Sequence, residues 1–139
     1  MKIFLQRYGL AIAWAILLFA LSSIPDLAFP VKVFSWDDKI HHAAAYTPLG
    51  FLLLHAIVAK GVCRRKDLWL AIVIGVLYGA LDEIHQHFVP RRFMDWTDAA
   101  ADALGVTFGS WIFYKWREYR LARQQQAGNG AHRKNLVAS

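Results

Sequence analysis

Four long apolar segments, separated by short clusters of charge, set the limits on what this chain can fold into. They cover residues 8–24, 43–59, 68–81 and 99–116. A helix needs about 20 residues, at about 1.5 Å each, to cross roughly 30 Å of hydrocarbon. Because a chain in lipid must satisfy its backbone hydrogen bonds internally, helices are favoured over strands. We therefore expect an all-α protein, a four-helix transmembrane bundle.

Two of these segments reach a spanning length only if they take ionisable residues into the membrane. The third is uncharged for 14 residues and must continue through Asp82 and Glu83 to about Phe88. The fourth must accept Asp102. A charged side chain near the membrane centre costs about 2.5–3.5 kcal/mol on insertion scales. We therefore expect these carboxyls to face other helices, and they are functional-site candidates.

The distribution of basic residues predicts the orientation of the bundle. The 139 residues carry a net charge of +6, with four Lys and Arg in residues 60–66 and six from residue 115 onward. Since basic residues are retained on the cytoplasmic side, we expect both termini inside, in a multi-pass protein of the cytoplasmic (inner) membrane. Clustering of charge between apolar runs argues against a nucleic-acid partner. Cys63 is the only cysteine, which excludes an intrachain disulfide.

The two ends of the chain need separate interpretation. The first segment could be a secretory signal, since Lys2 and Arg7 precede its apolar core. We favour a retained helix, because the following chain is itself hydrophobic and has no clear small-x-small cleavage site. Residues 124–139 contain Gln, Gly and Asn without a periodic apolar pattern, which is typical of disorder. We expect a four-helix membrane domain over residues 1–118 and a basic, polar, disordered cytoplasmic tail over 119–139.

In this topology, polar residues from distant parts of the sequence meet at the extracytoplasmic ends of the helices. On each of the last three helices they stand three or four apart and so share a face. These stripes are Lys39, His42 and Tyr46; Tyr78, Asp82 and Gln86; and Asp98, Asp102, Gly105 and Gly109. The glycine pairs 75/79 and 105/109 would let helices approach closely. Asp95 and Asp98 are expected at the start of the fourth helix, where its dipole favours acids.

The same residues form two signatures that resemble those of the VanZ-like membrane proteins. The first reads Asp38-Lys39-x-x-His42-x-x-x-Tyr46-x-x-Leu49-Gly50. The second reads Asp82-Glu83-x-x-Gln86, then Pro90-x-Arg92, then Asp98 and Gly105, and the exit Ser22-Ser23-x-Pro25 from the first helix also fits. The resemblance covers roughly residues 8–116. One departure is Asp102, which stands where the family typically has Asn and adds an ionisable group.

The resemblance implies a bacterial cell-envelope protein. The family's namesake is associated with low-level resistance to the glycopeptide teicoplanin, so antibiotic resistance is the role that the resemblance carries over. It names no reaction, and the sequence contains no nucleophile elbow or glycine-rich phosphate loop that would supply one. Whether the protein is an enzyme is therefore left open.

We expect the lipid bilayer to be one partner of this protein, and the residues at the extracytoplasmic ends of the helices favour an anionic molecule as a second partner. Lys39 and Arg92 could hold a phosphate or a carboxylate. A carboxyl among Asp82, Glu83 and Asp98 could act as general base, with His42 as proton carrier. Further substrate-binding candidates are Gln86, Tyr46, Asp38 and Asp102. We expect the protein to bind or process an anionic lipid headgroup or a lipid-linked cell-wall precursor.

Two other functions stay open. The polar cluster could be a non-enzymatic network that fixes helix packing, although interhelical polar contacts in membranes average only about 0.6 kcal/mol. It could also be the proton relay of a small oligomeric transporter or lipid translocator. No cofactor or metal is assigned, because a divalent-metal site built from Asp82, Glu83, His85 and His87 ranks low.

Overall fold

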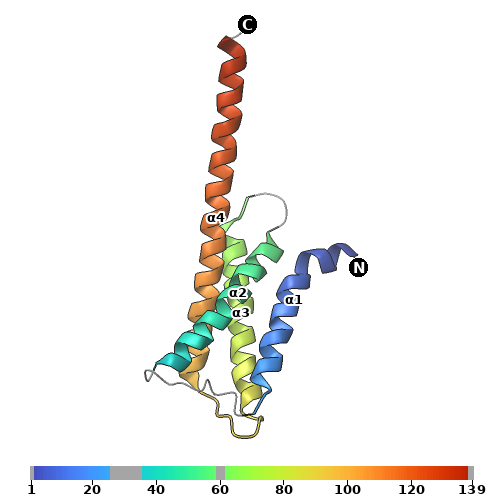
Figure 1. Cartoon of the computed structure of the whole chain (residues 1–139), viewed down its shortest axis with the longest axis vertical. Coiled ribbons are helices and arrows are strands. Elements are labelled where there is room, and N and C mark those ends of the chain that lie inside the picture. Colours follow the sequence, from blue (N-terminus) through green and yellow to red (C-terminus); the bar gives the residue numbers. More distant parts are fainter. Residues whose placement is uncertain (1, 26–35, 59–61, 138–139) are drawn as a thin grey trace.

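The computed structural model describes residues 2–25, 36–58 and 62–137, with side chains described from residue 4 to residue 129 of these ranges. Four α-helices follow one another: α1 (Lys2–Ser22), α2 (Asp37–Ile57), α3 (Arg65–Gln86) and α4 (Trp96–Val137). The described ranges contain no strand. The prediction of an all-α fold with four helices is therefore confirmed (Figure 1).

Consecutive helices run in opposite directions (Figure 1). At one end, Ser22 at the close of α1 bonds to Asp82 near the close of α3, and the start of α2 contacts the start of α4. We call this the polar end. At the opposite end, Arg7 of α1 donates hydrogen bonds of 2.6 Å to the carbonyl oxygens of Ala56 and Ile57, where α2 closes.

The closest packing in the bundle that we describe is between α2 and α4. We call this contact the glycine seam, and it is formed by Gly50, Gly105, Gly109 and Ser110. A Cβ on any of the three glycines would collide with a backbone carbonyl oxygen of the other helix. Ser110 Oγ donates to the carbonyl oxygen of Gly50 at 3.0 Å. The predicted close approach at the 105/109 pair is confirmed, because only glycine leaves room for backbones this near.

The second predicted glycine pair lies on α3 and makes room for side chains. A Cβ on Gly75 would overlap the side chain of Val106, and one on Gly79 would lie 3.1 Å from Cβ of Asp102 and 3.3 Å from the ring of Tyr46. The close approach expected at these glycines is confirmed. Gly79 in particular lets a buried acid from α4 and a tyrosine from α2 meet against α3.

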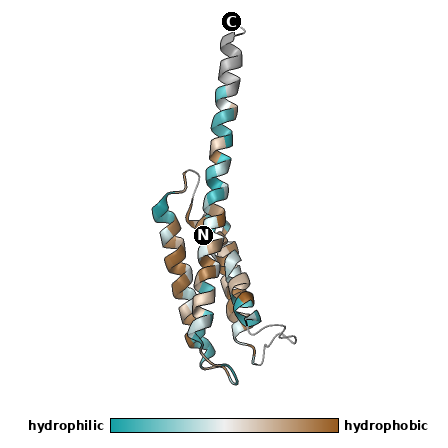
Figure 2. Ribbon diagram, turned by 90° about the vertical axis from the view of Figure 1, so that its left-hand side faces the viewer, coloured by the Kyte–Doolittle hydropathy of each residue, from teal (hydrophilic) through white to brown (hydrophobic). Residues whose placement is uncertain are grey.

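Two helical stretches are long and apolar enough to cross a membrane: Phe4–Ser22 and Arg65–Gln86. Large apolar side chains are also exposed around the bundle, with Leu10 67%, Leu81 65% and Leu104 69% exposed. Figure 2 shows this hydrophobic body between a hydrophilic polar end and a hydrophilic stretch of α4. Crossing of the membrane by the four helices, and the cytoplasmic location of both termini, stay predictions.

The C-terminal part of α4 differs from expectation. Instead of the disorder predicted for residues 119–139, the helix continues to Val137 and stands clear of the bundle (Figure 1). Residues 117–127 are rich in Arg, Gln and Ala, which are good helix formers. They also extend a helix that already exists, so no nucleation cost opposes them. Ala59, Lys60 and residues 138–139 lie outside the described residues, and the division at residue 118 stays a prediction.

Candidate functional site at the polar end

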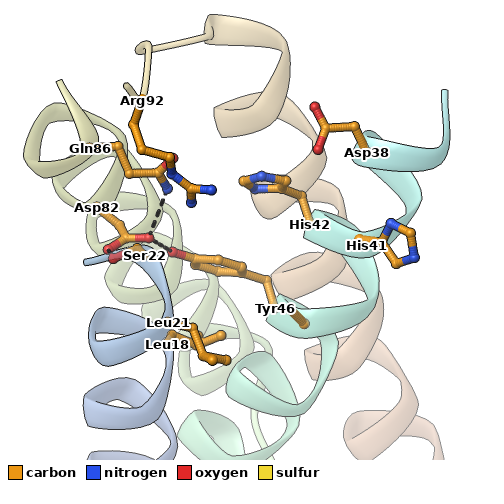
Figure 3. A pocket seen from close by; sticks show the side chains of 11 residues that line it. Leu18, Leu21, Ser22, Asp38, His41, His42, Tyr46, Asp82, Gln86 and Arg92 are labelled. Carbon is orange, nitrogen blue, oxygen red and sulfur yellow. Dashed lines mark hydrogen bonds between the residues drawn. The ribbon is translucent and has the colours of Figure 1, made fainter. Parts of the chain in front are cut away.

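A tight turn between α3 and α4 positions Arg92. The backbone N–H of Arg92 donates to the carbonyl oxygen of Val89 at 3.1 Å. Pro90 follows Val89, and Arg91 has a φ of 64°. Proline followed by a residue with positive φ is the pattern of a type II turn. Positive φ is unfavourable for a residue other than glycine, and this turn carries the side chain of Arg92 back toward the bundle (Figure 3).

Asp95 caps the N-terminus of α4. Its Oδ1 accepts hydrogen bonds from the backbone N and Oγ1 of Thr97, at 2.8 and 2.7 Å, as an N-cap residue does. Its Oδ2 accepts a 2.9 Å bond from Lys39 Nζ. The bonds from Thr97 and then from Lys39 lower the pKa of Asp95 to about 2. The predicted place of Asp95 and Asp98 at the start of this helix is confirmed.

Asp82 is the centre of a first group of contacts, which ties three helices together (Figure 3). Its Oδ1 accepts a 2.6 Å hydrogen bond from Ser22 Oγ of α1. Its Oδ2 accepts bonds from the hydroxyl of Tyr46 in α2, at 2.9 Å, and from Gln86 Nε2 one turn along α3, at 3.4 Å. Through these bonds Asp82 links α1 and α2 to α3 at the polar end.

A second group of contacts lies between α2 and α4. His42 Nδ1 is 3.0 Å from Asp102 Oδ1, and His42 Nε2 is 3.9 Å from Asp98 Oδ2. The other oxygen of Asp98 accepts a short hydrogen bond from Lys39 Nζ. Asp98 and Asp102, the two carboxylates of the α4 stripe, both contact α2. Lys39 and His42 reach them from one side of α2, as their three-residue spacing predicts.

Two carboxylates, Asp102 of this second group and Glu83 of α3 beside it, are fully buried and only partly hydrogen-bonded. Glu83 is 0% exposed and Asp102 is 1% exposed. Glu83 Oε2 accepts a 3.1 Å bond from the backbone N of Asp95. Among the described residues, Glu83 Oε1 and Asp102 Oδ2 have no hydrogen-bond partner. Leaving such a buried atom unsatisfied costs about 1–3 kcal/mol, so both oxygens require an explanation.

A pocket of about 120 Å³ opens beside both groups (Figure 3). Its lining divides into apolar and polar parts. The apolar part comes from Leu18 and Leu21 of α1 and Ala45 of α2. The polar part comes from all three neighbouring helices and the turn: Ser22, Asp38, His41, His42, Tyr46, Asp82, Gln86 and Arg92.

Every residue predicted as a catalytic or substrate-binding candidate lies at the polar end. Those that line the pocket are Asp38, His42, Tyr46, Asp82, Gln86 and Arg92. The others surround His42 or its carboxylate partners: Lys39, Glu83, Asp98 and Asp102. The convergence expected from sequence is thus present, while the chemical role of each residue stays a prediction.

Sequence reasoning missed several contacts. Ser22 enters the sequence prediction only as part of the exit from the first helix, with no contact predicted for it. Because that exit lies at the same end of the bundle as the polar stripes, the topology was a signal that could have predicted the bond of Ser22 to Asp82. His41 also lines the pocket. His85 was a candidate metal ligand, but its Nε2 lies 3.0 Å from Ser23 Oγ and its ring packs at a tilt against the ring of Phe19, with centroids 4.4 Å apart. The spacing of His85 along α3 directs it toward α1, away from Glu83.

Comparison with known proteins gives one family. The sequence model of the VanZ/LLP1 family matches residues 4–117. No curated protein and no solved structure matches the chain. The matched range covers α1, α2, α3 and the part of α4 that packs in the bundle, and it contains all the candidate residues.

Proposed function

The chain belongs to the VanZ/LLP1 family, and we propose that it is a four-span protein of the bacterial cytoplasmic membrane. Its polar end faces outward and binds the anionic headgroup of an envelope lipid or lipid-linked intermediate. The observation that carries this proposal is the division of the pocket into an apolar and a polar part. An amphiphile needs such a division, because its chain and its headgroup require different surroundings.

The polar lining suits a headgroup that carries both an anion and hydrogen-bond donors. The guanidinium of Arg92 can pair with a phosphate or carboxylate through two parallel hydrogen bonds. Asp38 and Asp82 would repel that charge but can accept bonds from hydroxyl or amide donors. A sugar phosphate or a peptide-bearing headgroup therefore fits these residues better than bare phosphate does.

The apolar lining suits the adjoining lipid chain. Leu18 and Leu21 lie below the polar groups in Figure 3, on the side toward the body of the bundle. Both belong to α1, one of the two helices of spanning length, and much of the bundle around it exposes apolar side chains. A chain packed on this side would enter the hydrocarbon layer beside α1, while its headgroup stayed at the polar end.

Binding can be measured with the full chain in nanodiscs, using native mass spectrometry and three probes: phosphatidylglycerol, phosphatidylcholine and an undecaprenyl-linked sugar phosphate. Arg92→Ala should weaken retention of the anionic probes about tenfold or more, since it removes a charge-assisted pair. Arg120→Ala, which removes an exposed arginine of α4, is the matched control. Equal retention of phosphatidylcholine and the anionic probes by the wild type would contradict the proposal.

A structural role is the second candidate, and the bonds from α1, α2 and α3 to Asp82 favour it. If these contacts serve packing alone, Asp82→Asn and Arg92→Ala should lower the amount of folded protein, and neither should change lipid selectivity of what remains. If the protein confers low-level teicoplanin resistance through headgroup binding, that resistance should fall in cells that contain the folded Arg92→Ala variant at normal abundance.

A further inference from the structure

Three potential metal ligands from three helices converge beside the pocket. His42, Glu83 and Asp98 each offer one ligand atom, and these atoms lie within 4.8 Å of one another. His42 Nε2 and Asp98 Oδ2 are 3.9 Å apart. Ligand atoms around one tetrahedral zinc ion are about 3.4 Å apart, given metal–ligand distances near 2.1 Å. The three groups therefore need to close by up to about 1.4 Å to hold one ion.

The partner of His42 prepares it for such a role. Asp102 Oδ1 lies 3.0 Å from Nδ1 of the imidazole, so that nitrogen donates and Nε2 keeps its lone pair in the neutral ring. Nε2 is the atom that faces Asp98. A metal-ligating histidine almost always donates its other N–H to a carboxylate or carbonyl, which fixes the ring and raises its basicity.

The net charge of the cluster and an unpartnered carboxylate oxygen both favour a bound cation. Glu83, Asp98 and Asp102 carry three negative charges when ionised, and the single positive charge of Lys39 is shared between Asp98 and Asp95. The three carboxylates therefore keep a net negative charge that a divalent cation would offset. Glu83 is fully buried and its Oε1 has no hydrogen-bond partner among the described residues. A buried carboxylate oxygen in that state is stabilised by a coordinated cation.

We infer that His42, Glu83 and Asp98 bind a divalent transition-metal ion such as Zn²⁺ or Mn²⁺, and that Asp102 is a positioning residue for His42. One imidazole and two carboxylates suit these ions. Three protein ligands leave a coordination position open, and His42 also lines the pocket. The competing arrangement is metal-free, with a protonated His42 shared between Asp98 and Asp102. This inference departs from the sequence analysis, which assigned no metal.

The test is metal binding by the full chain, purified in detergent and stripped with a chelator. Titration with ZnCl₂ and with MnCl₂ should show one tight site per chain for at least one of the ions. Glu83→Gln and His42→Ala should weaken it about 100-fold or more, and Asp102→Asn about 10–100-fold, as expected for loss of a ligand and of its orienting partner. His55→Ala is the matched control, because it removes an exposed histidine near the other end of the same helix and should leave metal affinity unchanged.

Several results would overturn the inference: no uptake by the wild type, uptake unchanged in Glu83→Gln, or equal loss in His55→Ala. If a variant does not fold, X-ray absorption of the zinc-loaded wild type decides. One imidazole with oxygen ligands is expected, whereas sulfur, two or more imidazoles, or none contradict the site. None of these measurements involves a lipid, so the metal site and the lipid-binding proposal can fail independently.

Discussion

The glycine seam and the polar end join the same two helices, α2 and α4, by opposite means. In the seam, Gly50, Gly105 and Gly109 bring backbone against backbone. About a turn away, Lys39 and His42 reach across to carboxylates of α4 through long side chains. The seam has no spare volume, while the polar end has a pocket and buried oxygens that lack partners.

The difference between the seam and the polar end shows how a small bundle can keep buried carboxylate oxygens that lack hydrogen-bond partners. Steric contact in the seam fixes the separation and rotation of α2 and α4, whatever the charges near it do. The packing of the seam therefore helps to position the carboxylates of Asp98 and Asp102, in addition to their contacts with Lys39 and His42. Functional sites commonly keep such unfavourable groups, supported by the rest of the fold.

The strongest way to break this comparison is to fill the seam. Gly109→Leu would drive a side chain into the backbone of α2 at Thr47, and backbone cannot move aside as a flexible side chain can. We expect a cost above about 3 kcal/mol and loss of the folded peak in size-exclusion chromatography. Gly9→Leu is the control, because nothing lies within 4 Å of a Cβ there. Similar thermal stability of the two variants would show that the seam does not hold the bundle.

A milder change at the polar end should sharpen the contrast. Tyr46→Phe removes one donor to Asp82 and leaves those of Ser22 and Gln86 in place. The expected loss of stability is about 1 kcal/mol, measured by denaturant or thermal unfolding. Tyr119→Phe, at a 60% exposed position, should cost nothing measurable. If Tyr46→Phe proved as damaging as Gly109→Leu, polar contacts and not the seam would hold the fold.

The smallest expected effect is on the pH dependence of stability and concerns Asp95, whose side chain is 46% exposed at the polar end. The pKa of Asp95 is lowered from 3.8 to about 2, by hydrogen bonds from Thr97 and Lys39. Its ionised form is therefore favoured in the folded state, and its contribution to stability is present above about pH 4 and lost as pH falls through 2. Asp95→Asn keeps an N-cap but removes the charge.

The stability difference between the wild type and Asp95→Asn should shrink as pH falls from 5 to 2. Thermal unfolding at a series of pH values measures it. A difference that stayed constant or grew on acidification would mean that the ion pair of Asp95 with Lys39 contributes nothing.

Much of the fold and part of the site could be predicted because helices impose regular spacing. Lys39, His42 and Tyr46 had to share a face once α2 was a helix, and Gly105 and Gly109 had to lie below Asp102. Apolar periodicity reports burial and not helicity, so its absence in the tail does not predict the extension of α4. Helical spacing does not predict the contacts of Ser22 and Asp95, because neither residue belongs to one of the three stripes.

By itself, the sequence determined that four helices form, that their acids would gather at one end, and that the chain resembles VanZ-like proteins. Periodicity and hydropathy are properties of one segment at a time, so they suffice for this. Only the tertiary structure decided that Ser22, Tyr46 and Gln86 meet at Asp82, while Glu83, its neighbour in α3, turns to His42 and Asp98. Adjacent residues of a helix point about 100° apart, and which neighbour each one meets depends on how the seam rotates the helices against one another.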